Sequence, residues 1–171
     1  MNPNSSAMLV TMRTCALWIY VVSFMLALNA CDYKVRELKP GKSTANEVRD
    51  VLGAPSNEWK ASDGSRQWEF ARGPQGTVTY MAFIGPDDVL RELHQVLSSS
   101  WFAKLQPGMG KNEVRKLIGR PGETMSFPAR REEVWTWRYE DGPAVQYQFN
   151  AHFDLDGRLV QTSTYRIGEP Q

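Results

Sequence analysis

Cysteine and histidine are scarce in this sequence, and their scarcity excludes several kinds of site. The 171 residues include two cysteines, Cys15 and Cys31, and two histidines, His94 and His152, which lie 58 positions apart. Neither histidine has a cysteine, a second histidine or a set of carboxylates at the spacing that a metal site uses. We therefore expect no metal, no cofactor and no catalytic cluster, and predict that the protein is not an enzyme.

An excess of charge of either sign is also lacking. The chain has 20 basic and 19 acidic side chains, and no run of like charge. Binding of nucleic acid requires a concentrated basic surface. We therefore expect no nucleic-acid partner. With 42% hydrophobic, 23% charged and 11% aromatic residues, the composition is that of a folded protein.

Charged side chains are almost absent from the N-terminal part. Arg13 is the only one before Asp32, and Ala16–Ala30 reads "ALWIYVVSFMLALNA". A short basic region followed by an apolar segment is typical of a secretory signal, and we assign residues 1–30 to a signal peptide. Two alternatives remain open. One is an uncleaved membrane anchor, since the 18 uncharged residues Thr14–Cys31 can just span a bilayer. The other is a simple secretory signal followed by a free cysteine.

The end of this segment, Leu28-Asn29-Ala30-Cys31, resembles the lipobox of bacterial lipoproteins, although Asn29 departs from the usual residue. The resemblance implies that Cys31 is acylated, as by palmitate, and becomes the first residue of the mature chain. We expect a lipid-anchored protein of the bacterial cell envelope that faces the periplasm. The outer membrane is favoured, and Asp32 keeps the inner membrane as the alternative.

One phrase of the sequence occurs twice. Asn46–Pro55 reads "NEVRDVLGAP" and Lys111–Pro121 reads "KNEVRKLIGRP". In the first copy, Thr44 and Glu47 are spaced as a capping box, which predicts a helix from about Thr44 to Leu52. In the second copy the apolar residues recur at the same helical spacing, so we expect a second helix there.

Both predicted helices are followed by the same residues. Gly53 and Pro55 follow the first helix, and Gly119 and Pro121 follow the second. Glycine in the left-handed αL conformation commonly ends a helix, and proline prevents its continuation. We interpret these four residues as structural helix stops.

Alternating segments rich in Val, Thr and aromatic residues follow each helix and predict antiparallel strands. They are Arg66–Ala71, Gly76–Ile84 and Asp87–Leu97, then Glu133–Glu140, Ala144–Phe153 and Gly157–Ile167. Residues 89–97 have helical spacing, but the repeat favours a strand. The predicted fold is α+β, with two tandem units that each pack a short helix layer on a three-stranded antiparallel sheet. The units are residues 31–97 and 105–167, with a linker at 98–104.

The second copy resembles the SmpA/OmlA (BamE-like) lipoproteins. The resemblance is carried by "LQPGMGKNEVRKLIGRP", the Trp-x-Trp-x-Tyr strand and "FDLDGRL", within Leu105–Tyr165, and the first copy matches more loosely. It implies a non-catalytic protein-binding or scaffolding factor in outer-membrane β-barrel assembly or envelope integrity. A tandem pair of such units also resembles the β-lactamase-inhibitor-protein fold. The alternative is therefore an inhibitor-like binder of a secreted enzyme.

Candidate partner-binding residues lie at the approach to the second helix. Gln106, Met109 and Lys111 belong to the copy that is closest to the family, and Met109 has no counterpart in the first copy. We predict that these residues contact a partner in the envelope, which the resemblance suggests is the β-barrel assembly machinery. The alternative for Met109 is that it folds back on its own sheet. The aromatic strands offer a second candidate surface.

Overall fold

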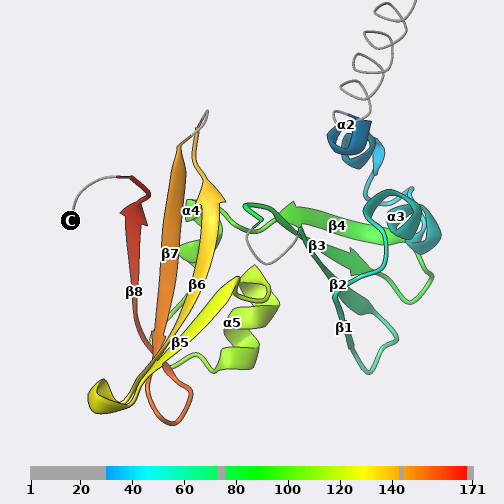
Figure 1. Cartoon of the computed structure of the whole chain (residues 1–171). Coiled ribbons are helices and arrows are strands. Elements are labelled where there is room, and N and C mark those ends of the chain that lie inside the picture. The colour runs from blue at the N-terminus through cyan, green and yellow to red at the C-terminus, as the bar shows by residue number, and fades with distance from the viewer. Residues whose placement is uncertain (1–29, 73–75, 143–144, 169–171) are drawn as a thin grey trace, which may run out of the picture. The chain divides into compact units, whose positions relative to one another are not determined.

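The computed structural model describes residues 30–72, 76–142 and 145–168 (Figure 1). The chain divides into two compact units, Met1–Lys39 and Pro40–Gln171. In the first unit the described helix is α2, Ala30–Glu37, whose backbone includes Cys31. The signal peptide predicted at residues 1–30 lies outside the described residues except for Ala30. No helix among the described residues has the length and apolar character needed to cross a membrane.

The second unit is α+β and contains two four-stranded antiparallel sheets, with strand orders β1-β2-β3-β4 and β5-β6-β7-β8. The elements of its first part are α3 (Ala45–Leu52), β1 (Asn57–Lys60), β2 (Arg66–Ala71), β3 (Thr79–Ile84) and β4 (Leu90–Gln95). Those of its second part are α4 (Ser99–Phe102), α5 (Lys111–Ile118), β5 (Glu123–Phe127), the 3-10 helix η1 (Pro128–Arg130), β6 (Glu132–Glu140), β7 (Gln146–Phe153) and β8 (Leu159–Arg166).

The prediction of three strands per sheet was wrong, because each sheet begins with a further strand. β1 and β5 are short edge strands, of 4 and 5 residues, and neither has buried side chains. Edge strands without a buried face show no apolar alternation, which is the pattern that identifies strands in a sequence. The strand prediction for residues 89–97 is confirmed for Leu90–Gln95, which pairs with β3.

The repeated Leu-x-Pro-Gly segments make equivalent backbone contacts in the two parts. The Gly41 N–H donates to the Leu90 carbonyl at 2.8 Å, and the Gly108 N–H donates to the Leu159 carbonyl at 2.7 Å. Both glycines have positive φ, 77° and 90°, which side chains rarely allow. The approach to each helix is thereby attached to the start of the last strand of the same sheet.

The helix starts follow the predicted capping chemistry. The Glu47 N–H donates to Thr44 Oγ1 at 3.3 Å, and the Thr44 N–H donates to Glu47 Oε2 at 2.6 Å, which completes a capping box. In α5 the Gly110 N–H donates to Glu113 Oε2 at 2.7 Å. Glycine has no side chain to return this bond, so α5 has only half of the box.

The helix stops differ from the prediction in one angle. Gly53 and Gly119 follow their helices with φ of 83° and 81°, and their N–H groups donate to Arg49 and Arg115 carbonyls. Their ψ angles, −162° and −179°, are not those of the αL conformation that we predicted. They belong to an extended region at positive φ that is essentially restricted to glycine. Glycine is therefore needed more strictly than an αL stop would require.

One hydrophobic core fills the space between α4, α5 and the second sheet. Its buried residues are Leu97, Phe102, Leu105, Val114, Ile118, Trp137, Tyr139, Phe149, Ala151, Phe153 and Leu159. Within it the ring of Phe102 stacks on that of Phe149 at 3.9 Å. Most of the aromatic side chains of β6 and β7 thus belong to the core and are not free to form the second candidate surface. Residues 98–104, predicted as a linker, contain α4 and contribute Phe102 to this core.

A fully buried carboxylate connects the first sheet to the end of α5. Glu69 on β2 accepts a hydrogen bond from Arg115 Nε at 3.2 Å and another from the backbone N–H of Arg120 at 2.9 Å. Beside it, Gln67 Nε2 donates to the Lys116 carbonyl at 2.6 Å. One face of β2 is therefore bonded to the C-terminal end of a helix that begins some forty residues later in the chain.

Candidate functional site: the open face of the second sheet

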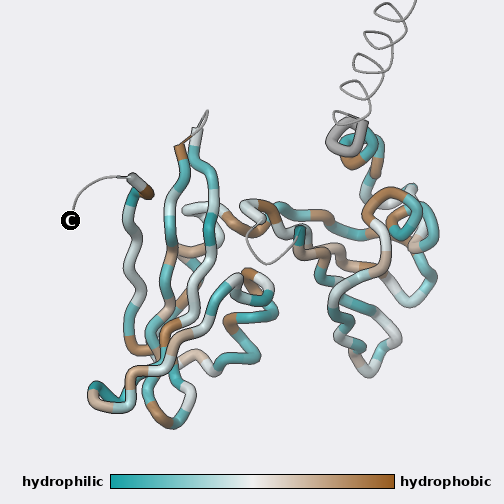
Figure 2. The backbone as a smooth tube through the Cα atoms, in the orientation of Figure 1, coloured by the Kyte–Doolittle hydropathy of each residue, from teal (hydrophilic) through white to brown (hydrophobic). Residues whose placement is uncertain are grey.

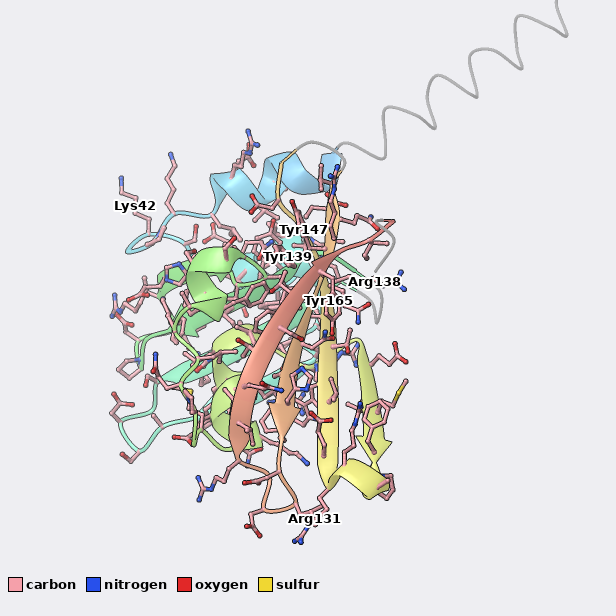
Figure 3. The ribbon with its side chains drawn as sticks, turned by 90° about the vertical axis from the view of Figure 1, so that its left-hand side faces the viewer. Lys42, Arg131, Arg138, Tyr139, Tyr147 and Tyr165 are labelled. Carbon is pink, nitrogen blue, oxygen red and sulfur yellow. The ribbon has the colours of Figure 1, made fainter. Side chains whose placement is uncertain are left out.

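One face of the second sheet is not covered by a helix that the structure describes. Successive side chains of a strand alternate between the two faces, and α4 and α5 lie on only one of them (Figures 1 and 3). Tyr139 and Tyr147 lie on the face that these helices cover, and Arg138 points to the opposite face (Figure 3). We call the uncovered side the open face; its main residues are Met125, Thr136, Asn150, His152, Ser163 and Tyr165.

Asn150 organises the centre of the open face. Its side-chain oxygen accepts hydrogen bonds from Thr136 Oγ1 at 2.8 Å and from Gln148 Nε2 at 3.1 Å. Its Nδ2 donates to Ser163 Oγ at 3.3 Å, and the residue is only 2% exposed. A buried amide that is bonded on three sides fixes its neighbours. The middle of this face is therefore a preorganised polar floor.

His152 extends this network toward one end of the sheet. Its Nδ1 lies 2.6 Å from Glu132 Oε1, and its Nε2 lies 3.0 Å from Ser163 Oγ. The order carboxylate, imidazole, hydroxyl is also that of a nucleophilic triad. A catalytic serine needs in addition hydrogen-bond donors aimed at a developing oxyanion. Ser163 instead lies within a paired strand, and its hydroxyl also contacts Tyr165 Oη at 3.2 Å. We interpret the network as a structural one.

The open face is hollowed over this floor. The hollow has a volume of about 470 Å³, which is within the range of small binding sites. Thr136, Asn150 and His152 line its floor, and Met125, Phe127 and Tyr165 supply apolar surface. Figure 2 shows that hydrophilic and hydrophobic residues alternate in short stretches along these strands. The hollow therefore combines preorganised polar groups with apolar surface.

Large hydrophobic side chains that remain exposed are concentrated around the second sheet. Among the described residues they are Met125, Leu155, Val160, Tyr165 and Ile167. Val160 and Tyr165 lie on β8, and Ile167 follows that strand directly. Three of the five thus lie on or directly after one strand, and exposed apolar side chains that gather in one region can mark an interaction site. The second sheet, and its β8 side in particular, is thus the best candidate surface for a partner.

The predicted partner-binding residues lie elsewhere. Gln106 is exposed, and Met109 is half-buried and packs against the hydrophobic core. The geometry of Met109 matches the alternative in which it folds back on its own sheet. Lys111 Nζ is 2.7 Å from Glu133 Oε2. A contact of these three residues with a partner stays a prediction.

The Lys111–Glu133 ion pair predicts a sensitivity to acid. The hydrogen bond from Lys111 holds the pKa of Glu133 below its usual value; partial burial opposes this, and the Trp135 indole N–H adds a second bond to the carboxylate. A depressed folded-state pKa stabilises the fold above the unfolded-state pKa, and that stability is lost as pH falls through the folded-state value. Glu133→Gln should therefore lower stability at pH 7 and flatten its dependence on pH below about 4.5. Urea unfolding at several pH values measures this. An unchanged slope would mean that the ion pair adds no net stability.

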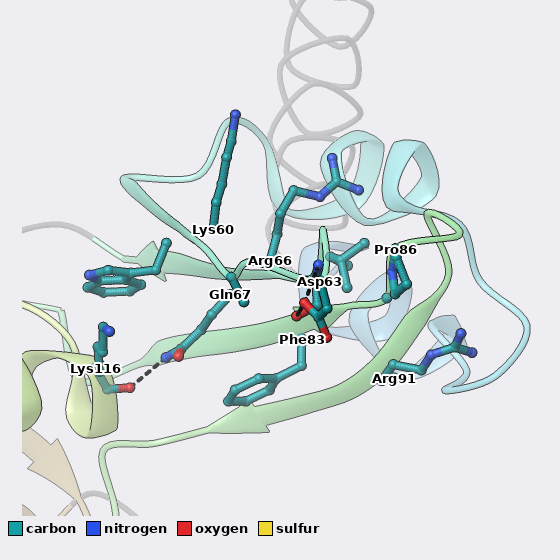
Figure 4. A pocket seen from close by; sticks show the side chains of 13 residues that line it. Lys60, Asp63, Arg66, Gln67, Phe83, Pro86, Arg91 and Lys116 are labelled. Carbon is teal, nitrogen blue, oxygen red and sulfur yellow. Dashed lines mark hydrogen bonds between the residues drawn. The ribbon is translucent and has the colours of Figure 1, made fainter.

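A second hollow lies on the first sheet (Figure 4). It measures about 420 Å³ and is lined by charged residues that include Asp63, Arg66 and Arg91. Asp63 accepts hydrogen bonds from the hydroxyl and the N–H of Ser65, which lower its pKa. Arg66 and Arg91 pair with Asp88 and Asp87. Because these charges already have neighbouring partners, this hollow is the weaker candidate.

Sequence reasoning did not find the open-face network. Glu132, His152 and Ser163 come from three strands, and only the register of those strands brings them together. The spacing of 20 and 11 residues between them matches no local motif. The alternation pattern could have placed each residue on the polar face of its strand, but it does not give the pairing.

No protein family and no curated protein matches this sequence. Two solved structures share partial likeness with it. One is a proposed beta-lactamase inhibitor protein from Streptococcus mutans, with 11% identity, coverage of 84% of this chain and 96% of that chain, and a TM-score of 0.29. The other is a DUF4309 family protein, YjgB, from Bacillus subtilis, with 14% identity, coverage of 75% and 82%, and a TM-score of 0.28. At these TM-scores neither likeness carries an argument about this chain.

Proposed function

We propose that this chain is a lipid-anchored envelope protein that binds other envelope proteins without catalysis, as an assembly or scaffolding factor for outer-membrane β-barrel proteins. The lipobox-like end of the apolar segment supports the anchor. The resemblance of Leu105–Tyr165 to the SmpA/OmlA lipoproteins supports the assembly role.

The observation that carries the proposal is the concentration of exposed hydrophobic side chains on the second sheet. Tyr165 and Met125 flank a hollow on its open face, and Val160 and Ile167 lie along its β8 side. Aromatic residues and Met are enriched in protein interfaces, where they supply much of the binding energy. The polar network beneath them holds the surface in one shape, which lowers the entropic cost of binding.

Acylation of Cys31 is the first testable part of the proposal. Intact-mass analysis should show a chain that begins at a lipid-modified Cys31, and Cys31→Ser should release the protein from the membrane fraction. An unmodified Cys31, or a chain that retains residues 14–30, would contradict the anchor. Membrane fractionation of wild type and Asp32→Ser separates the two locations. Movement of an inner-membrane wild type outward on mutation would assign it to the inner membrane.

The binding role is tested by crosslinking in intact cells, affinity purification from membranes and identification of partners by mass spectrometry. We expect envelope proteins in the eluate, and the double variant Met125→Ser with Tyr165→Ser should recover much less of them. Lys60→Ser, at an exposed residue of β1 outside the second sheet and its hollow, is the control and should leave recovery unchanged. Recovery of a secreted enzyme instead would support the inhibitor-like alternative.

A further inference from the structure

The outer edge of β8 differs from the other three sheet edges. β1, β4 and β5 have 4, 6 and 5 residues, and each includes a charged side chain; β8 has 8 residues and no charge from Leu159 to Tyr165. Natural proteins protect exposed edges with short strands, charges or proline, because an open edge pairs with other chains. β8 has none of these protections over seven consecutive residues.

The alternation of hydrogen bonds between β7 and β8 shows which backbone N–H and C=O groups of β8 point away from the sheet. The N–H of Ile167 donates to the Gln146 carbonyl at 2.9 Å, toward β7. Backbone groups in an antiparallel pair alternate in direction, so Ser163, opposite Asn150, also faces β7. Thr162 and Thr164 must then direct their N–H and C=O groups away from the sheet. Both residues are exposed.

Among the residues that the structure describes, the outer edge of β8 is paired only at its beginning. The Leu159 N–H donates to the Met109 carbonyl at 2.8 Å, and the Leu159 carbonyl accepts from Gly108 at 2.7 Å. This segment of chain pairs with the first residue of β8 and then enters α5. A partner strand could therefore continue the pairing from Val160 onward, over a stretch of about six residues, or roughly 20 Å at the usual rise of a strand.

Exposed apolar side chains lie along this edge. Tyr165 is 40% exposed and points to the open face, while Val160 is 54% exposed. Ile167 is 42% exposed and lies just beyond the strand. A strand added to β8 would cover these side chains with its own, on whichever face each lies. Main-chain hydrogen bonds and alternate side-chain contacts are together the requirements of β-strand addition.

We propose that the outer edge of β8 binds an extended segment of another envelope protein as an additional antiparallel strand of the second sheet. The inference deepens the proposed function and rests on it, since it names the class of partner segment. That segment alternates β-branched or aromatic with uncharged polar residues, because β8 offers no charge between Leu159 and Tyr165 to pair with. A second copy of this chain fits less well, because a lasting dimer buries roughly 1,200–2,000 Å² and contact between two β8 edges provides much less. An extended segment, by contrast, can be held by main-chain hydrogen bonds along a single edge.

The test uses a labelled synthetic peptide, Lys-Thr-Val-Thr-Tyr-Thr-Val-Thr-Lys, and the full acylated chain in detergent micelles. Binding is followed by fluorescence anisotropy and by hydrogen exchange of the protein amides. We expect saturable binding and slowed exchange at Thr162 and Thr164. A peptide that is N-methylated at alternate residues on its pairing edge should not bind, because it has lost those donors.

Thr162→Pro is the decisive variant. Proline is tolerated on an edge strand where the N–H faces solvent, so the fold should be retained while one outward donor is lost. The loss of one net hydrogen bond and of the local fit should raise the Kd of the peptide by about threefold to tenfold. Thr162→Ala keeps the backbone donor and is the matched control, with affinity close to wild type.

Three results would overturn the inference. They are equal affinity of wild type and Thr162→Pro, protection of β1 or β4 in place of β8, and no saturable binding of the peptide. Concentration-dependent dimers in analytical ultracentrifugation that Thr162→Pro abolishes would assign the edge to a second copy instead. Recovery of partners from membranes is a separate measurement, so it can succeed while the strand-addition inference fails.

Discussion

Replacing Gly119 with alanine is expected to lower the free energy of unfolding by about 3 kcal/mol, whereas Gly53→Ala should cost only about 1–2 kcal/mol. Both glycines adopt positive φ after a helix, 81° and 83°, so both variants carry the same backbone strain. Only Gly119 adds a steric conflict. A Cβ there would lie 2.8 Å from Thr79 Cγ2, while nothing lies within 4 Å of the equivalent atom at Gly53.

The pair of glycines provides its own control. Gly53 has the same role in the first part. The difference in lost unfolding free energy between Gly119→Ala and Gly53→Ala therefore measures the steric conflict with Thr79 on β3. Thr79→Ser removes the methyl group in conflict, so Gly119→Ala combined with Thr79→Ser should lose less than the sum of the single losses. Urea denaturation of the four variants measures this. Equal losses at Gly53 and Gly119 would mean that the end of α5 does not press against the first sheet.

Glu69→Ala is expected to destabilise the protein by about 2 kcal/mol, mainly because the N–H of Arg120 would lose its partner in a half-buried place. The loss of the ion pair with Arg115 adds to this. The Arg115 side chain is 34% exposed, so water can solvate its charge once the carboxylate is gone. The cost should therefore remain below that of breaking a fully buried ion pair.

Glu69→Gln distinguishes the two contributions. Glutamine keeps an amide oxygen that can accept from Arg120, but it has no charge for Arg115. Glu69→Gln should therefore retain more than half of the stability that Glu69→Ala loses. Its remaining loss should be smaller when the substitution is made in an Arg115→Ala background. Equilibrium unfolding in urea gives each value. If Glu69→Ala unfolds at the wild-type urea concentration, this carboxylate does not join the first sheet to α5.

The sequence was sufficient where local chemistry determines local structure. Thr44 with Glu47, and the glycine that follows, predicted the first helix of the repeat nearly to the residue, and the repeated phrase predicted the second helix before Gly119. The alternation of apolar residues predicted three strands of each sheet. The repeat also corrected the local pattern at residues 89–97, where helical spacing competes with a strand.

The sequence was insufficient where structure depends on register or on distant partners. β1 and β5 lack buried side chains, so no alternation marks them. The role of Glu69 depends on Arg115 and Arg120, which are 46 and 51 positions away. The ψ angles of Gly53 and Gly119 cannot be derived from residue type, because glycine permits several conformations at positive φ. The outward direction of Thr162 follows only from the ladder with β7.

Site-specific photocrosslinking in living cells tests most directly the central claim, that this chain binds envelope proteins through the second sheet. A photoreactive amino acid is placed at Thr164 on β8, at Lys60 on β1 and at Gln106, and adducts are identified by mass spectrometry. The account predicts one recurrent envelope protein crosslinked from Thr164, its loss in Thr162→Pro, and no adduct from Lys60. Adducts from Gln106 together with none from Thr164 would contradict it and place the contact at the approach to α5.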